Sequence, residues 1–389
     1  MTRDITKDCG KTRPTVLFVA TTPFVVNPFL TTHLITLSAD YRLVLCVNLD
    51  AYELTPRLNG VVELHHIPFA RKIDPVTDIR TLAQLFLLIR KIRPDVIHSI
   101  TPKGGLLAMT AGFLGRVPRR WHTFTGQVWA TRSGLRRWFL KSFDRIVATL
   151  ATRTFADSAS QCRLLQDEGV VKRGGISMMG SGSIAGVDLA RFHPDSDNRT
   201  STRQRLGTTQ NTCVFLFVGR LARDKGLFDL IHAFKQLARQ EPSVELWVVG
   251  PDEDGLQESL QNAGADACAP IRWLGSSPSP EQFMSAADVL VLPSYREGFG
   301  TVVIEAAACA IPSIAYRIDG IIDAVADGQS GLLVEAGNSE QFCQAMHKLA
   351  TDISLRQQLG QQAQQRAETS FSSISVTKAW LDFYHANIT

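Results

Sequence analysis

Two loops in the second half of the chain carry residue types that suit the binding of phosphate and sugar groups. Residues 293–305, P-S-Y-R-E-G-F-G-T-V-V-I-E, run from an apolar stretch through a glycine-containing loop into a helical pattern. Gly298 and Gly300 allow the backbone to approach a ligand, and the first turn of the helix offers N–H groups without intrahelical partners. Glu297 lies at the mouth of the loop, and Glu305 lies one turn into the helix, where it suits the two hydroxyls of a ribose. An ordinary strand–helix junction with two solvent-exposed glutamates would also explain this segment.

The other loop, Gly219 to Gly226, directly follows an apolar run at 213–218 and contains Arg220 and Lys225. Two cations bracketed by glycines at the carboxyl end of a parallel strand are suited to bind a diphosphate. Taken alone, the segment would fit a charged surface loop. Two loops of this character in one domain favour a nucleotide site.

The hydrophobic pattern provides the elements that must position these loops. Apolar runs typical of buried parallel strands alternate with helical patterns in both halves of the chain. The expected strands are 15–20, 42–47, 95–98, 120–124, 153–157, 213–218, 244–249, 289–292 and 312–315. The expected helices are 29–39, 78–92, 104–115, 135–152, 226–239, 281–287, 301–310, 339–350 and 376–389. This alternation predicts an α/β fold of two Rossmann-like, doubly wound domains facing a cleft, with ligands at the carboxyl ends of the strands.

Length and composition support two ordinary globular domains. The chain has 389 residues, of which 44% are hydrophobic and 20% charged, which excludes a disordered chain, a collagen and a coiled coil. The sequence shows neither an apolar run of about 18 residues nor a signal-peptide pattern. Its seven cysteines are scattered without a C-x-x-C pair, so we expect buried thiols in a reducing compartment, the cytoplasm.

Charge is distributed unevenly along the chain. Residues 1–190 carry a net charge of +11 and residues 191–389 a net charge of −7, so the first half is expected to meet something anionic. Nucleic acid, a membrane surface and a phosphorylated substrate are candidates. The stretch 116–145 concentrates the cations, with Trp121, Trp129, Trp138 and Phe139 interleaved among eight Arg and Lys residues and a single acid. This pattern is typical of a helix that lies among lipid headgroups, although a solvated face with some core aromatics would also produce it.

Four motifs in the second half resemble a known family. They are V-G-R-L-A-R-D-K-G, S-A-A-D-V-L-V-L-P-S, R-E-G-F-G-T-V-V-I-E-A and A-D-G-Q-S-G-L-L-V, in that order within about 213–370. Together they resemble glycosyltransferase family 4, the group 1 transferases of GT-B fold. The resemblance implies that Arg220 and Lys225 bind the donor diphosphate, that Glu297 contacts the donor sugar and that Glu305 binds the ribose. The donor-binding set it implies is Gly219, Arg220, Lys225, Gly298, Phe299, Gly300, Thr301, Val302 and Glu305, with backbone amides of Phe299 to Val302 binding phosphate and sugar.

The first half is similar to the same family through D-V-I-H at 95–98, W-H-T-F-T-G at 121–126 and S-I-A-G-V-D-L-A-R-F at 183–192. By position, the resemblance implies that His122 lines the donor sugar. It completes the catalytic set of Glu297, His122, Arg220 and Lys225. The loop A-T-T-P-F-V-V-N-P at 20–28 departs from the family because it lacks glycine, so we assign no donor contact there.

The resemblance also implies the organisation and the reaction. The expected domains are 1–185 for the acceptor, 186–375 for the nucleotide sugar, and a terminal helix, 376–389, that returns to the first domain; the glycine-rich stretch 174–186 joins them. The implied enzyme is a retaining hexosyltransferase that uses a nucleotide diphosphosugar, with UDP-sugar favoured, and requires no metal or other cofactor. We therefore expect the acidic triplets Asp252–Asp254 and Asp195–Asp197 to be solvated acids outside the site.

The expected acceptor is a polyprenyl-diphosphate-linked saccharide in surface-polysaccharide biosynthesis, such as O-antigen or capsule. The enzyme would then be cytoplasmic and peripheral to the inner face of the cell membrane, with an anionic membrane surface and no nucleic acid as partner.

Three other functions would use parts of the same pattern. A GT-B sugar-nucleotide 2-epimerase shares the fold and the nucleotide site but acts on the donor alone. An NAD-dependent dehydrogenase should carry G-x-G-x-x-G after the strand at 15–20, and this sequence does not. A non-catalytic sugar-binding module would not require both cations and both glutamates.

Overall fold

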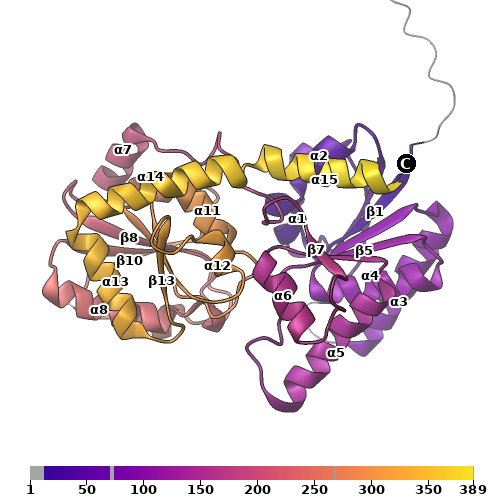
Figure 1. Ribbon diagram of the computed structural model, residues 1–389, viewed down its shortest axis with the longest axis horizontal. Coiled ribbons are helices and arrows are strands. Elements are labelled where there is room, and N and C mark those ends of the chain that lie inside the picture. Colours follow the sequence, from indigo (N-terminus) through magenta and orange to yellow (C-terminus); the bar gives the residue numbers. More distant parts are fainter. Residues whose placement is uncertain (1–12, 71–73, 267, 389) are drawn as a thin grey trace, which may run out of the picture. The chain divides into compact units, whose positions relative to one another are not determined.

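The computed structural model describes residues 13–70, 74–266 and 268–388, which divide into two compact units (Figure 1). The first unit comprises Met1–Thr123, Phe143–Thr154 and Trp380–Thr389. The second unit comprises Phe124–Ser142 and Phe155–Ala379. Each of the two sheets in the chain is built from strands that follow helices, and every strand pair whose register is described is parallel, as the sequence pattern predicts.

The first sheet has the strand order β3-β2-β1-β4-β5-β6-β7. Its strands are β1 (Thr15–Val19), β2 (Arg42–Val47), β3 (Glu63–His66), β4 (Val96–Ile100), β5 (Arg119–Phe124), β6 (Arg153–Ala156) and β7 (Ile176–Met178). Central strands β1 and β4 are buried along their whole length, because helices cover both faces of a parallel sheet. The helices of this half are α1 (Pro23–Phe29), α2 (Thr31–Leu37), α3 (Pro75–Ile92), α4 (Pro102–Leu114), α5 (Gly134–Leu150) and α6 (Ala159–Asp167), with a 3-10 turn η1 (Pro56–Leu58).

The second sheet has the strand order β10-β9-β8-β11-β12-β13. Its strands are β8 (Cys213–Val218), β9 (Val244–Val249), β10 (Ile271–Gly275), β11 (Val289–Leu292), β12 (Ser313–Tyr316) and β13 (Gly331–Val334). The helices that follow are α7 (Ser196–Leu206), α8 (Leu227–Gln240), α9 (Gln257–Gly264), α10 (Glu281–Ala286), α11 (Thr301–Ala308), α12 (Ile321–Ala324), α13 (Ser339–Thr351), α14 (Ile353–Ser370) and α15 (Ser373–Ile388), with a 3-10 turn η2 (Arg223–Lys225). Helices α8 and α13 pack together, as do α11 and α14, and Figure 1 shows the two pairs on opposite faces of the sheet. None of the described helices combines the length and the apolar character that crossing a bilayer requires.

Several elements differ from the sequence-based expectation. The expected helix 29–39 is the shorter helix α2 (Thr31–Leu37), and a second short helix, α1 (Pro23–Phe29), precedes it where the sequence indicated a loop. The glycine-rich stretch 174–186 contains strand β7 and is therefore not a simple joint. The pattern also missed α14, whose sequence is rich in glutamine and whose buried positions are the small or single apolar residues Leu359, Gly360, Ala363 and Ala367. A stripe of so few large apolar side chains gives a weak helical signal.

The core of the first unit closes around His98 on β4. Its ring stacks on Trp380 of α15 with centroids 5.1 Å apart, and its Nδ1 lies 2.6 Å from the Tyr384 hydroxyl. Its Nε2 lies 2.9 Å from Thr123 Oγ1, so both ring nitrogens have partners. Burial lowers the pKa of His98 to about 3, which keeps the ring neutral in this apolar surrounding. Residues from the end of the chain are thus part of the core of the first unit.

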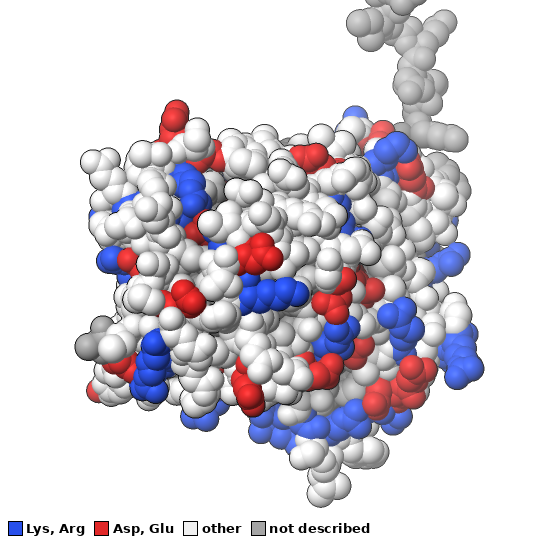
Figure 2. Space-filling model, turned by 60° about the vertical axis from the view of Figure 1, so that its left-hand side comes forward, with Lys and Arg blue, Asp and Glu red and all other residues white. Residues whose placement is uncertain are grey.

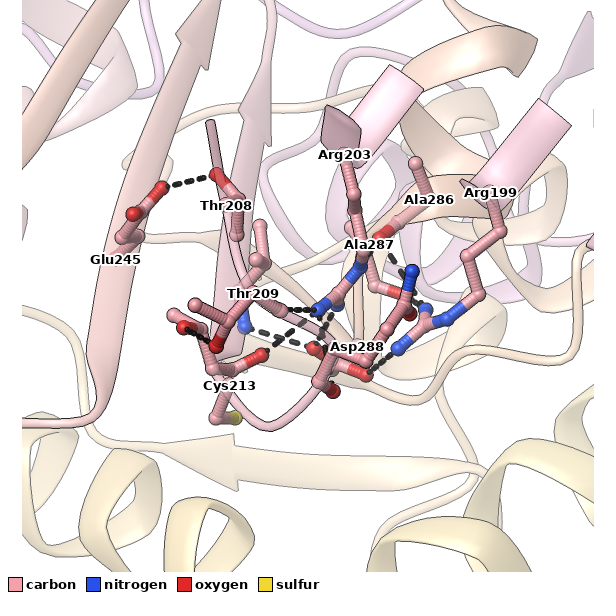
Figure 3. A network of polar contacts seen from close by, with 12 residues as sticks. Arg199, Arg203, Thr208, Thr209, Cys213, Glu245, Ala286, Ala287 and Asp288 are labelled. Carbon is pink, nitrogen blue, oxygen red and sulfur yellow. Dashed lines mark hydrogen bonds and ion pairs between the residues drawn. The ribbon is translucent and has the colours of Figure 1, made fainter. Parts of the chain in front are cut away.

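A buried polar network fixes the amino ends of β8 and β11 in the second unit (Figure 3). Figure 3 shows the guanidinium groups of Arg199 and Arg203, both from α7, converging on Asp288. Arg203 is fully buried and donates to Asp288 Oδ2 at 2.6 Å and to the Ala286 carbonyl at 2.9 Å. The same carboxylate accepts from the Val214 N–H of β8 at 2.8 Å. The two strands that precede the candidate loops are thereby held in register at their starts.

Candidate functional site

The candidate loops follow two neighbouring strands of the second sheet. Strand β8 is followed by Gly219–Gly226, and strand β11 is followed by 293–300. The strand order reverses its direction along the chain between β8 and β11. In doubly wound sheets the carboxyl ends of the strands at such a switch point form the ligand site. The structure therefore brings together the two loops that the sequence singled out.

The first loop passes close to the end of the neighbouring strand β9. Gly219 donates its N–H to Val249 at 3.0 Å, and a Cβ atom on Gly250 would lie 1.8 Å from the Gly219 carbonyl oxygen. Only glycine therefore fits at position 250 without moving the loop. The Arg220 guanidinium forms an ion pair with Glu253.

The acidic triplet Asp252–Asp254 lies against this loop: Asp252 and Asp254 are exposed, as expected for solvated acids, whereas Glu253 is half-buried and departs from that expectation. Besides the ion pair of Glu253, Asp254 Oδ2 accepts from the Arg223 N–H at 3.1 Å. Asp252 accepts from the N–H groups of Leu256 and Gln257, at the start of α9. The carboxylates thus hold loop and helix backbone. The other triplet is also structural, because Asp195 caps the amino end of α7.

The second loop is tied to the first by ion pairs. Lys225 Nζ lies 2.6 Å from Glu297 Oε1, and both side chains are largely buried. Arg296 Nη2 lies 2.6 Å from Asp224 Oδ2. Each loop therefore supplies one cation and one carboxylate to the pairs between them. Partial burial strengthens such pairs relative to the surface of a protein, because water screens them less.

The start of α11 offers backbone N–H groups beside these charges. Gly300 adopts a left-handed conformation, with φ at 81°, and no side chain caps the helix. The amides of Thr301 and Val302 lie in the first turn, where an α-helix provides no acceptor. Phe299 is buried and packs on Phe371 with ring centroids 5.1 Å apart, so its side chain anchors the loop. An uncapped helix start beside two cations attracts an anion.

Glu305 lies in the second turn of α11 and is partly buried. Burial raises its pKa to about 7, an effect that Arg191 opposes and Glu281 reinforces. Near neutral pH this side chain therefore exchanges between a carboxylate, which accepts hydrogen bonds, and a carboxylic acid, which can also donate one.

His122 belongs to the first unit, where it lies on β5. It is buried, its Nδ1 lies 2.8 Å from Ser99 Oγ, and a Cβ on Gly105 would lie 2.4 Å from its ring. Burial lowers the pKa of His122 to about 3, so the ring is neutral at physiological pH and can act as a hydrogen-bonding group but not as a cation. The remaining predicted residues, from Gly219 to Glu305, all belong to the second unit.

Sequence reasoning missed the residues that support the second loop from behind. Ser158 donates to the Gly298 carbonyl at 3.0 Å, and Gln161 Nε2 donates to the Glu297 carbonyl at 3.0 Å. Gly320 has φ at 90°, and a Cβ there would lie 2.6 Å from the Gly298 carbonyl oxygen. The available signal was the position of Asp157 and Ser158 at the carboxyl end of the expected strand 153–157.

The described residues contain no cluster of three or more His, Cys, Asp or Glu side chains arranged to hold a metal ion. The cations Arg220 and Lys225 and the amides at the start of α11 are the groups in the site that attract an anion.

Comparison with known families gives two matches that cover most of the chain. Residues 30–180 match the family described as glycosyl transferase 4-like domain, and residues 198–366 match the family described as glycosyl transferases group 1. The chain is 31% identical over 334 residues to the capsular polysaccharide biosynthesis glycosyltransferase CapM of Staphylococcus aureus, which covers 84% of this chain and 85% of CapM. It is also 37% identical over 195 residues to the D-inositol 3-phosphate glycosyltransferase of Corynebacterium jeikeium, which covers 47% of this chain and 46% of that protein.

Solved structures show the same fold. The structure of HepE from Anabaena, in complex with UDP and glucose, superposes with a TM-score of 0.78 at 20% identity and covers 95% of this chain and 99% of HepE. WaaG, a glycosyltransferase involved in lipopolysaccharide biosynthesis, superposes with a TM-score of 0.71 at 17% identity, covering 95% of this chain and 99% of WaaG. The predicted GT-B fold class is confirmed by these similarities.

Proposed function

Because the chain belongs to the group 1 glycosyltransferases, we propose that it moves a sugar from a nucleotide diphosphosugar to an acceptor hydroxyl, with retention at the anomeric carbon. The observation that carries the proposal is the meeting of Arg220, Lys225, Glu297 and the first-turn amides of α11 at the ends of β8 and β11. The family makes the chain a glycosyltransferase. The donor, the stereochemistry and the acceptor are the proposal.

The donor diphosphate would bind between Arg220 and Lys225. Both cations pair with carboxylates, Glu253 and Glu297, in the structure. A diphosphate offers each cation several oxygens, and hydrogen bonds between ionised groups are the strong ones. When Lys225 turns to the phosphate, the Glu297 carboxylate is left to accept hydrogen bonds from hydroxyls of the donor sugar. Glu305 would accept from the ribose.

The reaction needs stabilisation of the negative charge that develops on the leaving diphosphate. Arg220, Lys225 and the N–H groups of Thr301 and Val302 would supply it from fixed positions, which is the form of electrostatic catalysis that costs least reorganisation. The departing phosphate oxygen then takes the proton of the acceptor hydroxyl, so no protein side chain is required as general base. The proposed role of His122 is to hydrogen-bond the donor sugar as a neutral ring. Under this proposal the enzyme uses neither metal nor other cofactor.

A UDP-sugar is the favoured donor and a lipid-linked saccharide the favoured acceptor. HepE was solved with UDP and glucose, and CapM and WaaG are named for capsular polysaccharide and lipopolysaccharide biosynthesis. These names support a cell-surface polysaccharide as the product, and for such a product we propose a polyprenyl-diphosphate-linked saccharide as the acceptor. They guide the choice of substrates for the experiment.

Exposed side chains on and beside helix α5 support the proposal that the enzyme binds a membrane surface. Leu135 is 87% exposed and Trp138 is 63% exposed, and Arg132 and Arg136 are exposed beside them. Figure 2 shows a band of Lys and Arg side chains at the bottom of the view, with uncharged groups protruding beyond them. Exposed apolar groups among cations suit a layer of anionic headgroups. Of the predicted aromatics, Trp121 and Trp129 are buried and belong to the core. We therefore propose that the enzyme works in the cytoplasm, peripheral to the inner face of the cell membrane.

A panel of UDP-, GDP- and ADP-sugars tests the donor. We expect a UDP-sugar to raise the melting temperature of the protein and to be hydrolysed slowly to UDP and free sugar without acceptor. Analysis of the sugar by NMR separates the alternatives, because hydrolysis releases a sugar of unchanged configuration at C2 and a 2-epimerase inverts that carbon. Absence of binding and of turnover with every donor would contradict the proposal.

A further inference from the structure

A pocket of about 390 Å³ opens beside Glu297, and all of its lining residues belong to the second unit. One wall comes from the segment after β5, which contributes Gln127 and Trp129. Gln161 of α6 and the segment 317–322 complete it. Of these residues the sequence singled out only Trp129, as one of the aromatics in the basic stretch 116–145, and none is used in the donor chemistry described above.

Two buried oxygen atoms on this pocket lack partners. Gln127 is 2% exposed and Gln161 is 3% exposed, and the Oε1 atom of each is buried without a hydrogen bond. The other end of Gln161 is committed, because its Nε2 donates to the Glu297 carbonyl. That hydrogen bond fixes the orientation of the Gln161 amide, so the atom without a partner is its Oε1. A buried carbonyl oxygen without a partner is uncommon in a folded protein and indicates a missing donor.

The cations on the pocket are already neutralised. Arg137 lies 2.9 Å from Glu168, and the cations Arg296 and Arg317 pair with Asp224 and Asp327. The carboxyl of Asp319 faces the pocket too, and burial raises its pKa. The pocket residues that are buried without a hydrogen-bond partner are therefore represented by two acceptor atoms, the Oε1 atoms of Gln127 and Gln161. A sugar brings several O–H donors that would complement them, whereas an ionised phosphate oxygen only accepts.

We propose that this pocket binds a sugar ring of the acceptor, with Gln127 and Gln161 accepting hydrogen bonds from its hydroxyls and Trp129 providing an aromatic wall. The inference rests on the proposed function and names the part of the acceptor that the site reads. The pocket would recognise the saccharide of the acceptor and not its diphosphate. Arg137 of α5 lines the pocket, and its sequence neighbours Leu135 and Trp138 on the same helix are exposed, so α5 offers apolar side chains for the lipid end of the acceptor.

Steady-state kinetics with a UDP-sugar that is turned over and a farnesyl-diphosphate-linked monosaccharide tests this assignment. Gln127→Leu removes the carbonyl oxygen, and we expect the KM for the acceptor to rise about tenfold, with the KM for the donor and the slow donor hydrolysis unchanged. Gln127→Glu retains an accepting oxygen and should stay within about threefold of the wild type. Gln344→Leu, an exposed glutamine on α13, is the matched control and should have no effect.

The proposal is overturned if Gln127→Leu raises the KM for the donor instead, which would assign the pocket to the donor sugar, or if it leaves both KM values unchanged. Absence of donor hydrolysis by the wild-type protein would contradict the proposed function itself. Failure of the proposed function can therefore be distinguished from failure of the pocket assignment.

A second measurement uses the wild-type protein and does not depend on folding of a variant. Methyl glycosides of the acceptor's terminal sugar should inhibit competitively with the acceptor and not with the donor. Farnesyl diphosphate without a sugar should bind at least tenfold more weakly than the sugar-bearing compound. Equal binding of the two farnesyl compounds would show that the diphosphate is read and would overturn the proposal.

Discussion

Strands β8 and β11 carry ion pairs at both of their ends, and the two ends differ in how completely the charges are satisfied. At the amino ends, fully buried Arg203 gives hydrogen bonds to Asp288 and to backbone carbonyls, and Asp288 also accepts from a backbone N–H. At the carboxyl ends, Lys225 meets Glu297 through one described hydrogen bond, next to the uncapped start of α11. The same pair of strands thus has a saturated end, the amino end, where the charged groups make several hydrogen bonds each, and an open end, the carboxyl end, where they can still bind a ligand.

The difference shows which charges hold the fold and which can exchange partners. Removing one member of a saturated buried pair leaves a charge that no water reaches, so the cost falls on stability. Removing one member of the pair at the carboxyl ends breaks only one described hydrogen bond, beside an uncapped helix start, so we expect the larger cost to fall on the binding of an anion. Both ends carry a cation paired with a carboxylate, and they differ in the number of hydrogen bonds that each charged group makes.

The largest expected effect is on the stability of the saturated end. Asp288→Asn leaves the buried Arg203 without its counter-charge, and we expect the free energy of unfolding to fall by about 3–5 kcal/mol. Urea denaturation followed by circular dichroism measures it. Asp197→Asn, an exposed position on α7, is the control. Equal stability of the two variants would contradict the proposal that the charges at the amino ends of β8 and β11 hold the fold.

The next effect is on turnover at the open end. Arg220→Ala, Lys225→Ala and Glu297→Gln should each lose about 2–4 kcal/mol of transition-state stabilisation. This loss corresponds to a rate lower by roughly 30- to 1,000-fold. Denaturation midpoints should stay close to that of the wild type, and Arg239→Ala on the surface of α8 should leave the rate unchanged. Near-native turnover in two of the three variants would contradict the assignment of the site.

Asp157, behind the second loop, sharpens the comparison because it is a buried carboxyl without a counter-charge. A Cβ on Gly298 would lie 2.6 Å from its Oδ2, and its Oδ1 lacks a hydrogen bond. Burial raises the pKa of Asp157 to about 8, so the native state holds a proton that the unfolded state loses near pH 4. Stability should therefore fall as the pH rises from about 4 to about 8.

Asp157→Asn should flatten this dependence and stabilise the protein at pH 8 by roughly 1–3 kcal/mol, because the amide needs no proton to stay neutral. Thermal denaturation at pH 5 and pH 8 measures both effects. A variant that loses stability equally at both pH values would show that Asp157 is ionised in the native protein.

A smaller effect, on membrane binding, is expected for the exposed cations around α5. The protein should float with vesicles that contain anionic lipid at low salt, and less of it should do so at high salt. Arg132→Glu/Arg136→Glu, just before and at the start of α5, should weaken this binding, because each cation near the surface contributes about 1 kcal/mol. Arg239→Glu/Lys348→Glu changes the charge equally on α8 and α13 and is the control. Full recovery in the soluble fraction at low salt would contradict the membrane proposal.

The smallest expected effect is that of a chelator. If Arg220 and Lys225 neutralise the diphosphate, transfer should proceed at an unchanged rate in excess EDTA. Loss of activity with EDTA and its return with manganese or magnesium would show that the open end needs a metal in addition to its two cations.

The sequence predicted those parts of the fold that depend on local patterns. Strands β2, β8, β9 and β11 have the predicted bounds, because buried parallel strands are continuous apolar runs. The two loops were found because their glycines and charges follow those strands directly.

The rest of the site depends on contacts between distant segments. Gln161 and Glu297 are 136 positions apart, and neither spacing nor residue type indicates their hydrogen bond. Glu253 was expected in solvent for the same reason, since the close approach of Gly219 and Gly250 is a property of the sheet. Local patterns locate the groups that bind substrate, and the packing of the sheet determines the groups that hold them.

The position of Trp380 and Tyr384 in the core of the first unit has a consequence for synthesis on the ribosome. His98 stacks on Trp380 and lies within hydrogen-bonding distance of Tyr384, which are among the last ten residues of the chain. Domains otherwise tend to fold in the order in which they emerge. Here the core of the first unit needs Trp380 and Tyr384, which emerge after the second unit, so a nascent chain that has not yet reached Trp380 leaves the apolar surface around His98 without these rings.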